Sequence, residues 1–136
     1  MTFFDLVTDL YTYIDDNWTY CAYTFDNTPF KPPITDPWIR IALTPFESEN
    51  IALGSKCVRL RGLIAIQIFV RYDKGTGDAY AIADKIRDLL ENKIINSNIY
   101  TYESDVQAIG DSSRQLNHIQ SDWYQMNVNT YFETTS

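Results

Sequence analysis

The sequence predicts an α+β domain in which a mainly antiparallel sheet of four to five strands carries two helices packed on one face. Three stretches lead to this prediction. Residues 58–71 alternate apolar and other side chains, residues 78–90 repeat apolar side chains at helical spacing, and residues 123–132 alternate again. Because the elements run helix, strands, helix, strands, the 136 residues are expected to form one domain.

The strand at residues 58–71 is unusually long. Its core-facing residues are expected to be Val58, Leu60, Ile64, Ile66, Ile68 and Val70, and its other side carries Arg59, Arg61, Leu63, Ala65, Gln67, Phe69 and Arg71. At ~3.3 Å per residue it would reach roughly 45 Å, whereas a usual strand has about 5 or 6 residues. Gly62 predicts either a bulge or a close approach of another backbone.

A second helix is expected directly after this strand. Asp73, Gly75 and Gly77 supply turn residues, and Thr76 or Asp78 is a candidate cap. The apolar stripe of the helix consists of Ala79, Ile82, Ala83, Ile86, Leu89 and Leu90. This stripe is expected to pack on the core face of the long strand.

The chain begins with a pattern typical of an amphipathic helix over residues 3–15. Its apolar residues are Phe3, Leu6, Val7, Leu10, Tyr11 and Ile14. The aromatic segment at residues 18–25 predicts a short edge strand.

All five prolines lie between residues 29 and 57. We interpret this segment as an extended connector with a strand at residues 38–43 and a hairpin loop at residues 46–56. The loop carries Ile51 and Leu53, apolar side chains that a loop rarely exposes without a partner.

The carboxy-terminal part is predicted as a strand, a polar loop and a final strand. The first strand, residues 99–109, is expected to present Tyr100, Tyr102, Val106 and Ala108 on one side. Residues 110–121 form the loop. The last strand, residues 123–132, places Tyr124, Met126, Val128, Thr130 and Phe132 inside and Gln125, Asn127 and Asn129 outside.

The formal charge of −7 is unevenly distributed. Residues 1–30 carry five aspartates and no Lys or Arg, and residues 115–136 carry two acidic residues and no Lys or Arg. The acidic balance argues against binding nucleic acid by phosphate neutralisation. The acidic amino terminus and the lack of an apolar run of ~20 residues argue against a signal peptide and against a membrane partner.

Signals for catalysis or metal binding are weak, and no cofactor, metal site or catalytic residue is predicted. His118 is the single histidine and lies in a polar loop without a nucleophile motif. The DKGTGD turn at residues 73–78 matches neither a P-loop nor a dinucleotide fingerprint. Cys21 and Cys57 are expected to be buried free thiols, since they lack metal-site spacing.

Taken in order, PWIRIAL, RLRGLIAIQIFVRYDKGTGDAYAIADKIRDLL and YESDVQAIGDSSRQLNHIQSDWYQMNVNTYF resemble the tail-terminator, or tail-completion, proteins of long-tailed bacteriophages. These include the minor tail protein U family of lambda-like phages. The resemblance covers nearly the whole chain. It implies a hexameric ring without enzyme activity that sits on the last ring of the tail tube, stops its polymerisation and presents a surface to the head or neck.

This resemblance also implies the partners and the location. The partners would be copies of the chain itself, the major tail tube protein and a head or neck connector protein, while genome DNA passes through the channel without specific binding. The protein would reside at the head-proximal end of the virion tail and assemble in the host cytoplasm.

The residues suggest how such a ring could be built. The half-polar, half-apolar side of the long strand suits a contact between subunits, with Arg59, Arg61, Gln67 and Arg71 facing Asp5 and Asp9 of a neighbour's first helix. Acidic loop residues that repel DNA would line the channel, and the candidates are Glu47, Glu49 and Asp111. Ile51 and Leu53 are candidates for docking on the tail tube.

Two alternatives stay open at this point. One is a head–tail connector or neck protein of the same virion. The other is a small ligand-binding or hydrolytic domain, which would need a deep pocket that collects His118, Trp123 and an acidic residue.

Overall fold

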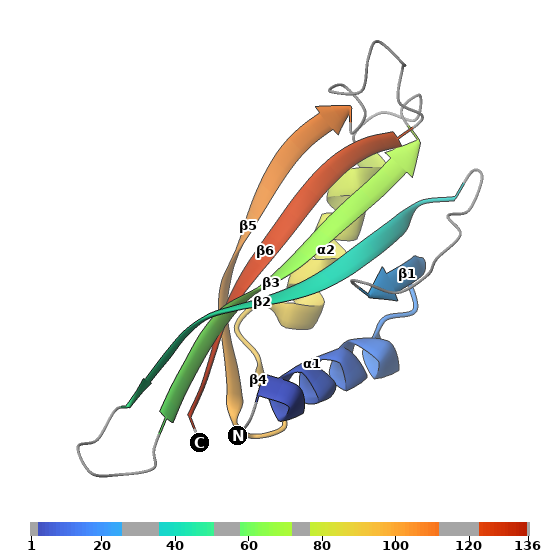
Figure 1. Ribbon diagram of the computed structural model, residues 1–136. Coiled ribbons are helices and arrows are strands. Elements are labelled where there is room, and N and C mark those ends of the chain that lie inside the picture. Colours follow the sequence, from blue (N-terminus) through green and yellow to red (C-terminus); the bar gives the residue numbers. More distant parts are fainter. Residues whose placement is uncertain (1–2, 26–35, 51–57, 72–76, 112–122, 136) are drawn as a thin grey trace.

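The computed structural model describes residues 3–25, 36–50, 58–71, 77–111 and 123–135. In chain order the elements are α1 (Phe3–Asn17), β1 (Ala22–Phe25), β2 (Trp38–Asn50), β3 (Val58–Arg71), α2 (Gly77–Leu90), β4 (Ile94–Ile95), β5 (Ile99–Asp111) and β6 (Trp123–Thr135). The strands of this described part form one twisted six-stranded sheet in the order β1-β2-β3-β6-β5-β4 (Figure 1).

The α+β class and the two helices are confirmed, and the sheet is mixed. Strand β1 pairs with β2 in parallel, whereas the other neighbours pair antiparallel. The strand that the sequence did not predict is β4, which has two residues. It lies among tight turns in which Asn92, Asn96 and Ser97 have positive φ angles of 53°, 52° and 65°, so it is too short to leave a periodic signal.

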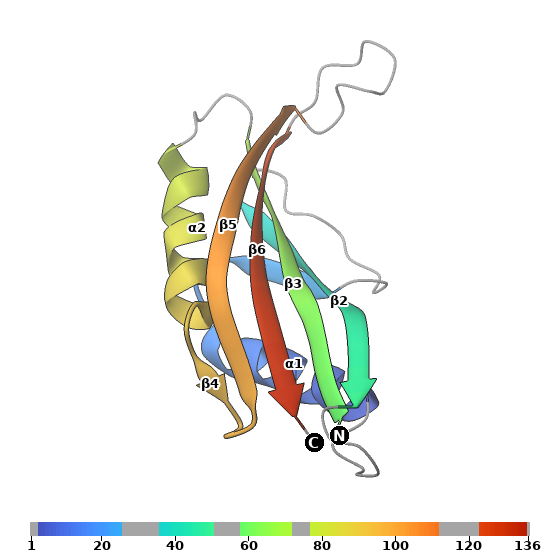
Figure 2. The same ribbon diagram turned by 90° about the vertical axis from the view of Figure 1, so that its left-hand side faces the viewer.

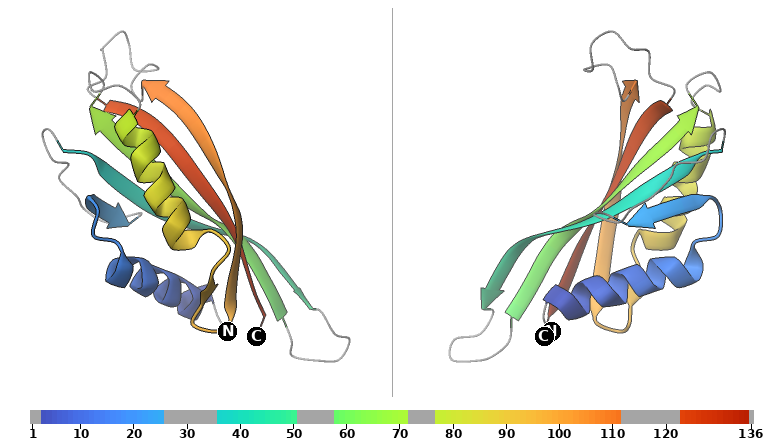
Figure 3. Two further views of the ribbon diagram at one scale, coloured as in Figure 1. Left: turned by 180° about the vertical axis from the view of Figure 1, so that it is seen from behind. Right: turned by 45° about the vertical axis from the view of Figure 1, so that its right-hand side comes forward.

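Both helices lie on the same face of the sheet (Figures 2 and 3). Helix α2 packs on β3 and β6, and Leu6, Leu10 and Ile14 of α1 belong to the same buried cluster as Ile82 and Ile86 of α2. The helices therefore cover what we call the inner face of the sheet, and the predicted packing of the second helix on the core side of the long strand is confirmed.

The long strand β3 alternates as its sequence predicts. Its buried inner residues are Leu60, Ile64, Ile66, Ile68 and Val70, whereas Arg59, Arg61, Leu63, Ala65, Gln67 and Arg71 are half-exposed on the other side. Gly62 lies at a close approach of its own backbone to the Phe132 ring, since a Cβ added at this position would lie 2.5 Å from that ring. The bulge lies in the neighbouring strand, between Pro45 and Glu47.

The hairpin formed by β2 and β3 is longer than predicted. Strand β2 continues to Asn50, so residues 46–50, which we expected in a loop, extend the ladder with β3. The bulge lets the strand pass Pro45, which has no amide hydrogen for the ladder. The Asn50 and Val58 ends of this hairpin project beyond both helices (Figure 1).

The side chains of β5 do not all lie on the side of the sheet that we expected. Tyr100 pairs with Glu133 on the side away from the helices, whereas Val106 pairs with Val128 on the inner face. A register shift between Thr101 and Ser104 separates them. The four residues predicted to share one side are thus divided between two sides, because a bulge adds a residue and reverses the alternation. The strand also extends through Gly110 and Asp111, which we expected in the polar loop.

A candidate subunit interface

The sheet face opposite the helices, which we call the outer face, is not covered by any described helix (Figures 1 and 3). Residues paired across antiparallel strands share a face, so the register defines its members. They are Trp38, Arg40, Ala42 and Thr44 of β2; Arg59, Arg61, Leu63, Ala65, Gln67, Phe69 and Arg71 of β3; Trp123, Gln125, Asn127, Asn129, Tyr131 and Glu133 of β6; and Tyr100, Tyr102, Asp105 and Gln107 of β5.

One end of the outer face carries an aromatic–arginine cluster, which consists of Trp38, Arg40, Phe69, Arg71 and Trp123. The Trp38 and Phe69 rings stack with centroids 4.2 Å apart, and Trp123 meets Trp38 edge-on at 6.2 Å. The guanidinium carbon of Arg40 lies 5.4 Å from the Trp38 centroid, and that of Arg71 lies 5.2 Å from Trp123. Mutual stacking explains why Phe69 is only 7% exposed although it faces away from the helices.

The other end carries a Glu133 network, which consists of Arg59, Tyr102 and Glu133. Arg59 Nε lies 2.6 Å from Glu133 Oε1, and the Tyr102 hydroxyl donates a hydrogen bond to Glu133 Oε2. This hydrogen bond to the carboxylate is the main cause that raises the pKa of Tyr102. Both Glu133 oxygens thus have partners within the chain.

Tyrosines and small apolar side chains lie between these two ends. The Tyr131 hydroxyl donates to Asp105 Oδ2 at 3.2 Å, and this bond raises the Tyr131 pKa. Tyr131 still exposes 39% of its surface, beside half-exposed Leu63 and Ala65. The outer face therefore mixes apolar surface, arginines and amides.

The residues predicted to form a subunit contact occupy two separate surfaces. Arg59, Arg61, Gln67 and Arg71 all lie on the outer face, whereas Asp5 and Asp9 lie on α1, on the helix side of the sheet. One chain cannot bring the two sets together across its own sheet. A contact between them requires two copies.

The candidate channel residues are not where the sequence led us to expect. Glu47 and Glu49 belong to β2, where they pair in register with Arg61 and Arg59, and Asp111 ends β5 opposite Tyr124. The loop assignment of all three residues was therefore wrong, because both strands continue past the predicted turns. Ile51 and Leu53 lie outside the described residues.

Sequence reasoning missed Arg40, Trp38 and Trp123 as members of the outer face. The alternation of PWIRIAL gave part of the signal, because it separates Trp38 and Arg40 from Ile39 and Ile41. The clustering depends on two registers, Trp38 opposite Phe69 and Arg71 opposite Trp123. No local pattern specifies those registers.

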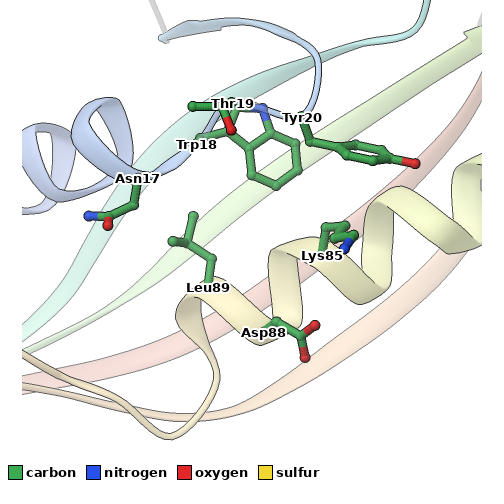
Figure 4. A pocket seen from close by; sticks show the side chains of 7 residues that line it. All are labelled: Asn17, Trp18, Thr19, Tyr20, Lys85, Asp88 and Leu89. Atoms are coloured by element: carbon green, nitrogen blue, oxygen red, sulfur yellow. The ribbon is translucent and has the colours of Figure 1, made fainter.

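A hollow of about 470 Å³ lies between the end of α1 and α2 (Figure 4). It is lined by Asn17, Trp18, Thr19, Tyr20, Lys85, Asp88 and Leu89. Trp123 is not among these residues and His118 lies outside the described ones, so the hollow does not provide the pocket that the ligand-binding alternative needs. It offers a cation over an aromatic ring, Lys85 Nζ 5.8 Å from the Tyr20 centroid, and no nucleophile–base pair.

Other chemical signals are equally sparse in the described ranges. No group of three or more His, Cys, Asp or Glu side chains there is placed to hold a metal ion. None of the described helices is long and apolar enough to span a membrane. Cys21 is a free, half-buried thiol whose pKa burial raises to about 11, and Cys57 lies outside these ranges.

The fold and the outer face define a class: a small α+β protein with two helices on one face of its sheet and no described helix on the other. A family model described as "Phage tail terminator protein" matches residues 6–130, and the chain belongs to this family. It is thus a structural component of phage tail completion. The family resemblance drawn from the sequence is confirmed, while the closer likeness to the lambda-like U proteins stays a prediction.

A solved structure shares the fold, with a TM-score of 0.70 and 13% sequence identity over 98% of this chain and 96% of that chain. At this identity the likeness concerns the fold alone. No curated protein gives a significant match.

Proposed function

We propose that the protein assembles as a hexameric ring that caps the tail tube, stops its polymerisation and offers the attachment surface for the head or neck. The observation that carries this proposal is the outer face, which combines apolar surface with arginines and is not covered by any helix of the described residues. Such a mixed surface is typical of protein interfaces, in which arginine and aromatic residues are enriched.

The ring contact that we propose joins two different surfaces of neighbouring copies. Arg59, Arg61, Gln67 and Arg71 of the outer face would meet Asp5 and Asp9 on α1 of the next copy. A contact between unlike surfaces is heterologous, and it produces a closed ring when the rotation between copies closes. The placement of the two surfaces on opposite layers of the domain supports this arrangement.

The remaining roles follow from this ring. The β2–β3 hairpin projects past the helices, which supports docking on the major tail tube protein through Ile51 and Leu53. Glu47, Glu49 and Asp111 are proposed to line the channel, where like charge would let genome DNA pass without binding. The ring would sit at the head-proximal end of the tail and bind a head or neck connector protein, after assembly in the host cytoplasm.

The experiment is to mix the purified protein with tail tubes that have open ends and to image them by electron cryomicroscopy. We expect one ring of six copies at one end of each tube and no further growth when tube protein is added. Tubes that keep growing, or ends without added density, would contradict the proposal. Rings found only on the portal side of isolated necks would favour the connector role instead.

A further inference from the structure

We propose that Arg40 and Arg71 of the aromatic–arginine cluster are the charged anchor of the subunit contact, and that they bind the α1 carboxylates Asp9 and Asp16 of a second copy. This inference rests on the proposed ring and names the residues that hold it together. It differs from the interface described above because it gives Arg59 and Arg61 a supporting role.

The arginines at the other end of the outer face already have acidic neighbours in their own chain. Arg59 forms an ion pair with Glu133, and its side chain is only 31% exposed. Arg61 lies opposite Glu133 on one side and opposite Glu47 on the other. At Arg59 an incoming carboxylate would have to compete with Glu133, and such an exchange of partners at a part-exposed ion pair brings little net affinity.

Arg40 and Arg71 are in a different position. Within the described residues, neither forms an ion pair, and both place the guanidinium carbon within 6 Å of aromatic centroids, the range of cation–π attraction. Arg40 lies over two rings, at 5.4 Å from Trp38 and 5.8 Å from Phe69. A guanidinium that packs against a ring keeps its N–H edge for a carboxylate.

The rings also restrict the motion of these side chains. Arginine normally loses rotamer freedom when it enters an interface. Contacts with Trp38, Phe69 and Trp123 have already restricted Arg40 and Arg71 in the single chain. Aromatic and arginine side chains together are the composition in which interface hot spots are enriched.

The acidic partner is identified by charge and spacing. Residues 1–30 carry no Lys or Arg, so α1 has no cation of its own beside its carboxylates, whereas Asp84 and Asp88 on α2 accompany Lys85 and Arg87 on the same helix. Asp9 and Asp16 are seven residues apart and share one stripe of the helix, whereas Asp15 lies off that stripe and accepts a hydrogen bond from Tyr23.

The spacing of the two arginines on the sheet is compatible with the spacing of the two aspartates on the helix. From the ladder, the backbones of Arg40 and Arg71 lie about 14 Å apart, four residues along β3 and one strand across. Asp9 and Asp16 lie about 10 Å apart along the helix, and flexible side chains bridge the difference. Asp16 also lies at the negative end of the helix dipole, where a neighbour's cation is stabilising.

The test is a charge reversal with rescue. The variants are Arg40→Glu/Arg71→Glu, Asp9→Lys/Asp16→Lys and the combination of all four substitutions. The matched control is Arg87→Glu/Lys93→Glu, which makes the same charge change on exposed residues that lie neither on the outer face nor in the hollow beside the end of α1. The readout is the protein concentration at which half of the open tail tubes carry a ring, with circular dichroism and melting as folding checks.

We expect each double reversal to raise this concentration by about 100-fold, roughly tenfold for each charge pair lost. The fourfold variant should return to within about threefold of the unaltered protein, and the control should stay there. Arg40→Gln/Arg71→Gln removes both positive charges without introducing repulsion, so it should raise the half-occupancy concentration by about tenfold. This variant replaces the charge reversal in the test if Arg40→Glu/Arg71→Glu does not fold.

Three outcomes overturn the inference. If rings form normally with Arg40→Glu/Arg71→Glu, these two arginines are not the anchor of the subunit contact, and the proposed ring itself stands. If Arg40→Glu/Arg71→Glu weakens ring formation and the fourfold variant does not restore it, the α1 carboxylates are not the partner of these arginines. Binding of duplex DNA by the unaltered protein, lost in Arg40→Glu/Arg71→Glu, assigns the cluster to nucleic acid instead. If the unaltered protein forms no ring, the proposed function itself fails, and the control variants then add nothing to that result.

Discussion

Gly62 on β3 lies directly against the ring of Phe132 on β6. A Cβ at Gly62 would come within 2.5 Å of Phe132 Cζ and within 2.7 Å of the Thr44 carbonyl oxygen. The backbone of β2 and a core side chain of β6 therefore both occupy the space that any larger residue would need. Gly62 thus lies where β3 pairs with both β2 and β6, next to the bulge in β2.

Gly62→Ala should accordingly destabilise the protein. The added methyl group meets backbone on one side and an inner-face ring on the other, so the free energy of unfolding should fall by about 1–3 kcal/mol. Urea unfolding followed by circular dichroism measures it. The matched control is Gly77→Ala, at the first residue of α2, where nothing lies within 4 Å of the new Cβ. That variant should be neutral or slightly stabilising, and equal effects of both substitutions would refute the steric explanation.

Thr101 is a second structural test, because its buried hydroxyl joins the end of α2 to β5. Thr101 Oγ1 donates to the Leu90 carbonyl and accepts from the Lys93 amide at 2.7 Å. Thr101→Val should lower the free energy of unfolding by about 1–3 kcal/mol, since it leaves both backbone groups without this partner. Thr101→Ser keeps the hydroxyl and should retain most of the stability. A valine variant as stable as the unaltered protein would contradict a stabilising role of the hydroxyl.

The Cys21 thiol should react slowly at neutral pH. Burial raises its pKa from 9.0 to about 11, so at pH 8 only about one thiol in a thousand is ionised. In a Cys57→Ser background, alkylation by iodoacetamide should accelerate up to about pH 11 in folded protein and level off near pH 9 in urea. The folded state favours the neutral thiol, so stability present below pH 9 should decline as the pH rises to 11. Equal pH profiles in both states would contradict this.

Glu133→Gln should lower the pKa of Tyr102. The carboxylate that accepts the Tyr102 hydroxyl is the main cause of the raised value, and a neutral amide removes the negative charge. Titration of ¹³C-labelled tyrosines by NMR, assigned with Tyr102→Phe, measures the shift. Tyr131, whose pKa depends on Asp105, should keep its value and serves as the internal reference. A Tyr102 pKa that does not move would show that Glu133 is not its partner in solution.

Local patterns in the sequence predicted most of the elements, and long-range pairing explains the errors. The alternation of β3 and the stripe of α2 follow from side-chain periodicity, which the sequence carries directly. Strand β2 continues through Pro45 because β3 lies beside it in register, and a proline seen alone indicates an end. In β5 the bulge after Thr101 has no local marker, so the faces beyond it were assigned incorrectly.

The candidate interface was predictable only in part for the same reason. Arg59, Arg61, Gln67 and Arg71 lie on one strand, where alternation alone groups them. Arg40 and Trp38 join Arg71 through two strand registers, which depend on contacts between residues far apart in the sequence. The loop residues Ile51 and Leu53 remain a prediction of the sequence.

The two borders of the sheet have a consequence for how copies of the protein meet. Within the described ranges, β1 pairs with residues 38–41 of β2, and β4 pairs with residues 99 and 100 of β5, so most of each edge strand has no neighbour there. Proline and a bulge interrupt the rest of β2, and two bulges interrupt β5, irregularities that discourage a foreign strand from adding to the ladder. Edge-to-edge stacking of copies into fibrils is thereby disfavoured, so the sheet edges of this tail-completion protein protect it against uncontrolled polymerisation.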